Sequence, residues 1–164
     1  MSSDYSYIGK PVPRIDAPVK SKGEAKYTDD LELPGMLHAR VLRSPIAHGR
    51  IINIDTSRAK SIPGVVAVIT GQDCPNSPVS TWLNFPKSFD QYILAKDKVR
   101  YVGEEIAAVA AIDEETAEEA LEAIVADFEQ LPAVFDPEEA LKEGAPAVHE
   151  SKKNNISARW IQEH

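Results

Sequence analysis

The chain of 164 residues carries 26 Asp and Glu against 18 Lys and Arg, and 43% of its residues are apolar. This size and composition suit one ordinary core, so we expect a single soluble domain. No stretch approaches the roughly 20 apolar residues that a membrane span needs, and residues 1–10 lack the basic start and apolar centre of an export signal. We therefore expect a cytoplasmic protein with no membrane partner.

Charge and cysteine content exclude further classes. Residues 104–150 contain 15 Asp and Glu and a single Lys, a net charge of −14. A surface this acidic repels phosphates, so no nucleic-acid partner is expected. Cys74 is the only cysteine, which excludes an intrachain disulfide, a four-cysteine iron–sulfur site and a structural zinc site built from cysteines.

The chain begins with a loose segment that leads into strands. Residues 1–7 are polar and without pattern, and we expect a flexible N-terminus. Lys10–Asp30 contains three prolines, which remove backbone donors and disfavour helix before them. We expect this segment to be extended or looped, a form consistent with packing along another surface. Alternating side chains over Met36–Leu42 predict a strand buried on one side, and a second strand is expected over Arg50–Ile54.

A strand, a short helix and another strand are predicted in close succession. Asp55 or Thr56 can cap a helix over residues 57–62, which Pro63-Gly64 ends. Val65–Ile69 is then expected to be a buried strand. This succession indicates compact packing of helix on sheet, although it does not establish a parallel crossover.

Residues 71–90 form the longest irregular segment of the chain. Loops of this length are often functional or rest on a neighbour, and the segment contains Trp82 and Phe85. An anchor within the domain is the alternative for each aromatic side chain. Two short strands, Tyr92–Ala95 and Val99–Val102, are predicted to follow.

The clearest elements lie in the second half. Ile106–Ile112 has no polar side chain, which predicts a strand covered on both faces at the centre of the sheet. Asp113 is placed to cap an amphipathic helix that ends near Glu122. A half-buried strand over Ile124–Phe128 and a short helix over Glu138–Lys142 complete the predicted elements.

Motifs for catalysis are missing from the sequence. There is no phosphate loop, Gly-x-Gly-x-x-Gly, His-Glu-x-x-His or Gly-x-Ser-x-Gly. His38 and His48 would approach one another if their strands paired, but two histidines without a third ligand are weak grounds for a metal site. A small hydrolase using Cys74 and a histidine is a further alternative, although none of these residues has a recognisable context. We expect no catalytic, cofactor-binding or metal residue in this chain.

Charged and aromatic side chains are instead candidates for contacts with other domains or subunits. Four cationic side chains surround the proline-containing loop near residue 45, and two adjacent carboxylates precede the apolar run. Neighbours on a strand point to opposite sides, so this doublet does not form a facing acid–base pair. Solvated arginines, turn caps and buried loop anchors are the alternatives. The candidates are Arg40, Arg43, His48, Arg50, Trp82, Phe85, Glu104, Glu105 and Trp160.

Several co-linear motifs carry a family resemblance. They are the run Arg14–Asp30, Leu33-Pro-Gly-Met-Leu37, Arg43-Ser-Pro-Ile-Ala-His-Gly-Arg-Ile51, Pro63-Gly-Val65 and Val99-Arg-Tyr-Val-Gly-Glu-Glu-Ile-Ala107. Together they resemble the N-terminal α/β hammerhead domain of the molybdenum hydroxylase large subunit. That family includes xanthine dehydrogenase, aldehyde oxidase, carbon monoxide dehydrogenase and 4-hydroxybenzoyl-CoA reductase. Gly103-Glu104-Glu105 departs from the commoner Gly-Glu-Pro of the family.

The resemblance implies an α+β fold with a mixed β-sheet and two or three helices. It places the hammerhead domain at residues 8–150, and residues 151–164 as the start of a linker to a missing molybdopterin-binding domain. It also implies hydroxylation at an electron-poor carbon, or reductive dehydroxylation in one branch, at a molybdenum–pterin centre. Electrons would pass through two iron–sulfur clusters and, in most members, FAD on partner subunits.

The resemblance implies that this domain is structural. The cofactor-binding segments and the catalytic glutamate of the family lie in later domains, so the isolated chain is predicted to be inactive and to pack against the molybdopterin and iron–sulfur parts. The alternative is a free-standing, non-catalytic interaction or assembly module. The substrate and the direction of the reaction cannot be read from this part of the protein.

Overall fold

The computed structural model describes residues 6–78, 91–157 and 161–162. The chain divides after Met36 into two units, Met1–Met36 and Leu37–His164. The first unit contains a five-residue helix, α1 (Ala17–Ser21), and a single 3₁₀ turn, η1 (Thr28–Asp30). The prediction that Lys10–Asp30 is entirely extended or looped is therefore wrong in detail, because Pro18 occupies an early helical position, where proline is tolerated.

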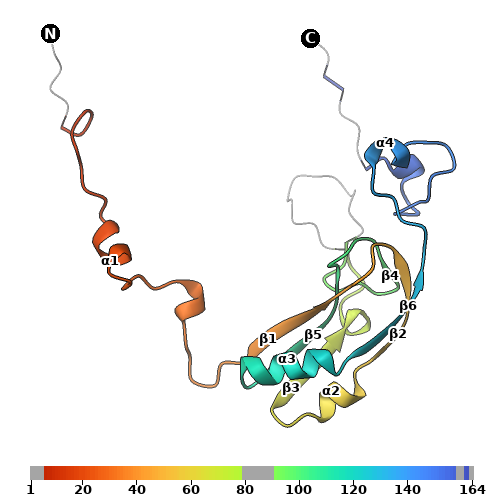
Figure 1. The fold of residues 1–164 in the computed structure, drawn as a ribbon, viewed down its shortest axis with the longest axis horizontal. Helices are drawn as coiled ribbons and strands as arrows, with labels where there is room; N and C mark the ends of the chain where they lie inside the picture. Colours follow the sequence, from red (N-terminus) through yellow and green to blue (C-terminus); the bar gives the residue numbers. More distant parts are fainter. Residues whose placement is uncertain (1–5, 79–90, 158–160, 163–164) are drawn as a thin grey trace. The chain divides into compact units, whose positions relative to one another are not determined.

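The second unit contains two small antiparallel sheets (Figure 1). In the first sheet β5 (Glu105–Ala111) lies between β1 (His38–Arg43) and β3 (Val65–Thr70). Both pairings of β5 are antiparallel, with Arg40 and Val68 opposite Val109. The prediction that the apolar run forms a central strand is confirmed.

In the second sheet β2 (Gly49–Asp55) lies between β4 (Lys98–Val99) and β6 (Val125–Gln130). These pairings are antiparallel as well. The α+β class is confirmed, but the expected mixed sheet is wrong: the strands on either side of the short helix α2 (Ser57–Ser61) belong to different sheets and form no parallel pair.

Helix α3 (Glu114–Glu122) covers one face of the first sheet (Figure 1). Its start is capped as predicted, since Asp113 accepts a hydrogen bond from the backbone N–H of Thr116 over 2.7 Å. Small side chains allow the helix and the sheet to approach closely. The core below the helix comprises Ala59, Val68, Ala107, Val109, Ala120 and Ile124.

A second apolar cluster joins the two sheets. Val99 and Ile106, both almost fully buried, pack with Ala95 against half-buried side chains that include Leu42 and Phe128. Ile106 therefore lies in a different cluster from Val109, although both belong to β5. Because one strand supplies both clusters, it ties the two sheets into one core.

Two predicted strands differ from the structure. The prediction that β3 is buried is wrong, because it is an edge strand in which Val68 alone is buried and Val66 is 59% exposed. The pair of strands predicted around residues 92–102 is reduced to the two residues of β4. Tyr92–Ala95 forms no strand, although Leu94 and Ala95 are buried and the backbone of Ala95 lies against Gly71.

The segment after β6 carries a fourth helix, α4 (Pro137–Ala140), and a 3₁₀ turn, η3 (Lys153–Asn155). Asp136 caps α4 as predicted, accepting from the backbone N–H groups of Glu138 and Glu139. The described ranges thus contain four α-helices, one or two more than expected. None of these described helices has the length and apolar character needed to cross a bilayer.

Candidate functional site

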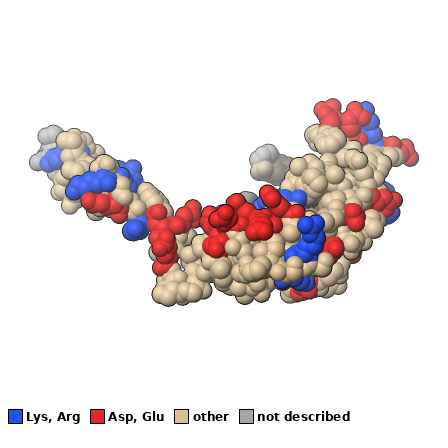
Figure 2. Space-filling view, turned by 60° about the horizontal axis from the view of Figure 1, so that its bottom comes forward, with Lys and Arg blue, Asp and Glu red and all other residues tan. Residues whose placement is uncertain are grey.

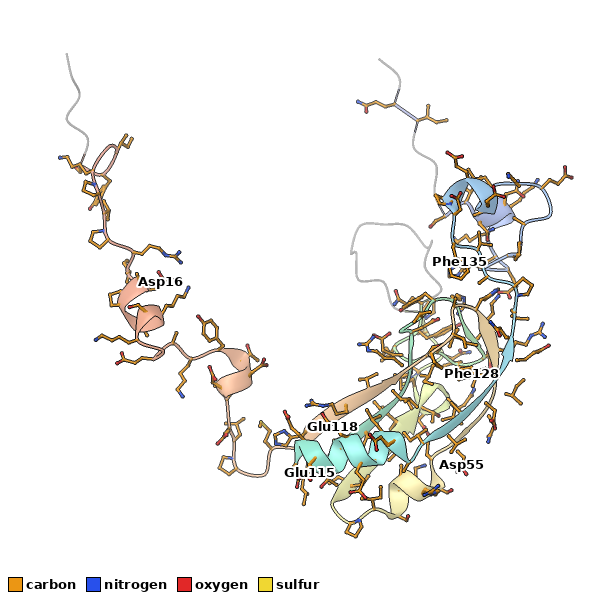
Figure 3. The ribbon with its side chains drawn as sticks, viewed as in Figure 1. Asp16, Asp55, Glu115, Glu118, Phe128 and Phe135 are labelled. Carbon is orange, nitrogen blue, oxygen red and sulfur yellow. The ribbon has the colours of Figure 1, made fainter. Side chains whose placement is uncertain are left out.

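The three candidate arginines pair with carboxylates of their own chain. Arg40 lies under α3, where its Nη2 is 2.9 Å from Glu114 Oε2 and its Nε is 3.4 Å from Glu118 Oε1. Figure 3 shows Glu118 on this helix, and Figure 2 shows Asp and Glu side chains gathered on one face with Lys and Arg beside them. Arg40 therefore partly neutralises the acidic helix.

Arg43 and Arg50 are held across strands. Arg43 Nη1 donates to Glu105 Oε1 over 2.7 Å and to the Gly103 carbonyl over 2.8 Å. Arg50 Nη1 donates to Glu129 Oε2 over 2.9 Å in the second sheet. The expected single cationic group is thus divided between the two sheets, and each arginine has carboxylate partners of its own.

His48 is 4% exposed at the start of the second sheet. Its Nδ1 lies 2.6 Å from the carbonyl oxygen of Pro132, and because a carbonyl only accepts, Nδ1 carries the hydrogen. Nε2, an acceptor when the ring is neutral, is buried with no hydrogen-bond partner in the structure. His38 belongs to the other sheet, 3.8 Å from Glu114, so the strands of the two histidines do not pair.

Glu104 is a buried turn cap. It is 5% exposed and accepts a hydrogen bond from the backbone N–H of Arg100, whose Nη1 lies 3.9 Å from the other carboxylate oxygen. Burial raises the pKa of Glu104, while the Arg100 N–H, the Arg100 guanidinium and His149 act in the opposite direction. The adjacent Glu105 points away toward Arg43, as the alternation of a strand requires.

Sequence reasoning missed the lysine beside this turn. Lys98 is only 8% exposed, and its Nζ donates to Glu150 Oε1 over 2.6 Å and to the Ala147 carbonyl over 3.4 Å. The hydrogen bond to Lys98 holds the pKa of Glu150 below its usual range. No local signal marks Lys98 as buried, since its hydrogen-bond partners Ala147 and Glu150 follow some fifty residues later.

We name these side chains the polar junction: His48, Lys98, Arg100, Glu104, His149 and Glu150. The junction fastens the segment after β6 to the second sheet, with the Leu131 N–H donating to the His48 carbonyl over 2.9 Å. Nε of Arg100 is buried without a hydrogen-bond partner in the structure. Arg100 directly follows Val99, and Val99 pairs with Gly49, the residue after His48.

The segment after β6 also presents an exposed aromatic ring beside a hollow. Phe135 is 85% exposed, in contrast to Phe128 of β6, which packs in the second cluster (Figure 3). The hollow has a volume of about 480 Å³ and is lined by Ala133, Val134, Phe135, Asp136, Glu139, Lys142, Glu143, Gly144, Ala145 and Pro146. Sequence reasoning did not single out Phe135, because nothing local distinguishes an exposed ring from a buried one.

Three candidates, Trp82, Phe85 and Trp160, lie outside the described residues. Within the described residues, no group of three or more His, Cys, Asp or Glu side chains is arranged to hold a metal ion. The geometry therefore defines an α+β domain whose buried polar groups fasten its own segments together.

Residues 22–132 match the family described as "Aldehyde oxidase and xanthine dehydrogenase, a/b hammerhead domain". The chain belongs to this family. It is 38% identical over 161 residues to the xanthine dehydrogenase molybdenum-binding subunit of Escherichia coli O157:H7, covering 92% of this chain and 21% of that protein. It is 38% identical over 144 residues to the carbon monoxide dehydrogenase large chain of Hydrogenophaga pseudoflava, covering 87% and 18%.

Solved structures agree with this assignment. Quinoline 2-oxidoreductase from Pseudomonas putida 86 matches with a TM-score of 0.80 at 35% identity, over 92% of this chain and 20% of that one. CO dehydrogenase from Oligotropha carboxidovorans matches with a TM-score of 0.74 at 38% identity, over 84% and 17%. The chain thus spans about a fifth of the length of these relatives.

Proposed function

We propose that this chain is the structural hammerhead domain of a molybdenum-cofactor-dependent oxidoreductase, and that it is non-catalytic by itself. One observation carries the proposal: 92% of the chain aligns with only 21% of a protein named as a molybdenum-binding subunit. The chain therefore corresponds to one part of such a subunit. A cytoplasmic location belongs to the same proposal.

The described residues do not fit a molybdenum–pterin group. They include no cluster of potential metal ligands, and the hollow beside Phe135 is lined by one Lys, three carboxylates and otherwise backbone and apolar groups. We therefore derive no reaction step through the cofactor in this chain. The family resemblance supports a cofactor bound by later domains, with iron–sulfur clusters and FAD on partner subunits.

The role we assign to the domain is to pack against the molybdopterin and iron–sulfur parts. Arg43, Arg50 and Glu105 remain candidate contacts, since their side chains are 57%, 60% and 30% exposed while already held by ion pairs. Such held side chains lose little conformational freedom when a partner docks. Glu104 and His48 are poorer candidates for direct contact, because both are buried within the chain.

The test is to express the complete reading frame that contains this sequence together with its neighbouring genes. Molybdenum content would be measured by mass spectrometry, and dye reduction would be followed with purines, aldehydes and N-heterocycles. For the complete protein we expect one molybdenum per large subunit and turnover of one of these substrates. For the 164-residue chain alone we expect neither bound molybdenum nor turnover. Molybdenum binding with turnover by the isolated chain would refute the proposal. A frame without further domains would instead support the free-standing interaction module.

A further inference from the structure

The N-terminal unit exposes an unusual amount of apolar side chain. Neither α1 nor η1 contains a buried residue. The exposed fraction of the large apolar side chains ranges from 37% for Met36 to 98% for Ile15. Large amounts of exposed apolar surface mark interaction sites in soluble proteins. These side chains are Tyr7, Ile8, Val12, Ile15, Val19, Tyr27, Leu31, Leu33 and Met36.

Local bonds give this unit its form but cannot stabilise it alone. Asp16 pairs with Arg14 at 2.8 Å and with Lys20 at 2.7 Å, and Asp30 accepts from the backbone N–H of Tyr27 at 2.9 Å. Exposed pairs of this kind contribute only about 0–1 kcal/mol each. Isolated helices shorter than ~12–15 residues are marginal in water, and α1 has five residues. A surface outside the unit must therefore supply the missing stabilisation.

Composition indicates the chemistry of that surface. Residues 6–27 contain five Lys and Arg against two Asp and Glu, a net charge of +3, interspersed with the apolar side chains, whereas residues 28–36 add three carboxylates and no Lys or Arg. Pro11, Pro13 and Pro18 limit the backbone freedom that docking would otherwise remove. The surface complementary to residues 6–27 is therefore apolar and bears carboxylates.

The relatives indicate where that surface lies. A match over 95% of this chain leaves about 8 residues unmatched (5% of 164), so the match with CO dehydrogenase extends into residues 6–36. It covers only 20% of the other chain, so most of that chain lies beyond the matched part. The remaining domains of that longer chain offer such a segment a surface that the 164-residue chain by itself does not contain.

We infer that residues 6–36 are a docking arm that lays its apolar side chains on an apolar surface of the large-subunit domains outside this chain, and that this surface bears carboxylates where it meets residues 6–27. The inference rests on the proposed function, because it takes those domains as the occupant. It goes further by naming the segment that makes the contact and the chemistry of the surface that receives it.

Amide hydrogen exchange of the complete large subunit, compared with the 164-residue chain, tests the arm. We expect amides of residues 15–33 to exchange at least tenfold more slowly in the complete subunit. Ile15→Asp in the complete subunit should remove at least tenfold of that protection, because a charge replaces an apolar contact. Ile52→Asp is the matched control: Ile52 is 63% exposed on β2, and the arm should stay protected.

Equal exchange in the two proteins, or an unchanged arm in Ile15→Asp, would overturn the inference. The inference would also be overturned if the arm amides of the isolated chain became more protected as the protein concentration rises. The arm would then be docking on a second copy of the chain. Failure of the proposed function can be distinguished from failure of the docking arm. A subunit with molybdenum and turnover but an unprotected arm refutes the arm alone, whereas a protected arm on a subunit without molybdenum refutes the function alone. A reading frame without further domains would refute both the docking arm and the proposed function. The DNA sequence of that frame would show this before any exchange measurement.

Discussion

Lys98 and Glu150, 52 positions apart, are joined by a 2.6 Å hydrogen bond between Nζ and Oε1. The lysine is buried beside the second sheet, whereas the glutamate side chain is 71% exposed. The bond therefore fastens a peripheral segment to the sheet, because the ammonium would otherwise be buried with only the Ala147 carbonyl, 3.4 Å away, as its partner.

Glu150→Gln should lower the free energy of unfolding by about 1 kcal/mol at pH 7, since a hydrogen bond to a charged group is weakened and solvent screens the exposed carboxylate. The pKa of Glu150 is lowered in the folded state, so its contribution is present above the unfolded pKa and is lost as the pH falls through the folded pKa. Urea unfolding should show the two proteins converging in acid. Glu143→Gln, exposed in the same segment, should match the parent throughout.

Glu104→Gln should show the opposite dependence on pH. The pKa of Glu104 is raised by burial, so its contribution to stability is full below the unfolded pKa and declines as the pH rises through the folded pKa. Glutamine keeps an acceptor for the Arg100 N–H but does not titrate. Urea unfolding across the acid to neutral range should find the parent most stable relative to the variant at the acid end. A difference that grows with pH would show that the pairing with Arg100 outweighs burial.

Val109→Asp should prevent folding. Val109 is 1% exposed and lies in the middle of the core beneath α3. An unpaired carboxylate there costs several kcal/mol, against a total stability of ~5–15 kcal/mol for a domain. Circular dichroism and thermal unfolding should show no cooperative transition. Val66→Asp, at a 59% exposed position on β3, should unfold cooperatively. A native-like Val109→Asp protein would mean that the core is wrongly placed.

Gly71→Ala should destabilise the protein by about 1–3 kcal/mol, the usual range for overpacking. A methyl group at Gly71 would collide with the carbonyl oxygen of Ala95 and approach its carbonyl carbon to 2.7 Å, and backbone cannot yield as a side chain can. Gly103 provides the contrast: a Cβ there meets nothing within 4 Å, but its φ is +93°. Gly103→Asn should therefore cost less, since asparagine tolerates positive φ better than most residues. Thermal unfolding of both variants would rank them.

Hydrophobic periodicity and helix caps predicted several of the local elements. The apolar run predicted the central strand, and Asp113 predicted the start of α3, because both signals depend on near neighbours in the chain. The family followed from motifs in their order along the sequence. Gly103 and Gly71 show what such signals do not reveal: the first is needed for its positive φ, whereas the second is needed for close backbone approach to a distant residue.

Tertiary structure decided which strands pair and which charges are buried. The local sequence pattern of a strand is the same whether its partner is parallel or antiparallel. The prediction of a mixed sheet was therefore wrong, and the structure has two antiparallel sheets joined by β5. The expected cationic group was divided because Arg40 and Arg50 belong to different sheets. Lys98 is buried and its Nζ bonds to a segment some fifty residues away, a contact between distant residues that no short window of sequence encodes.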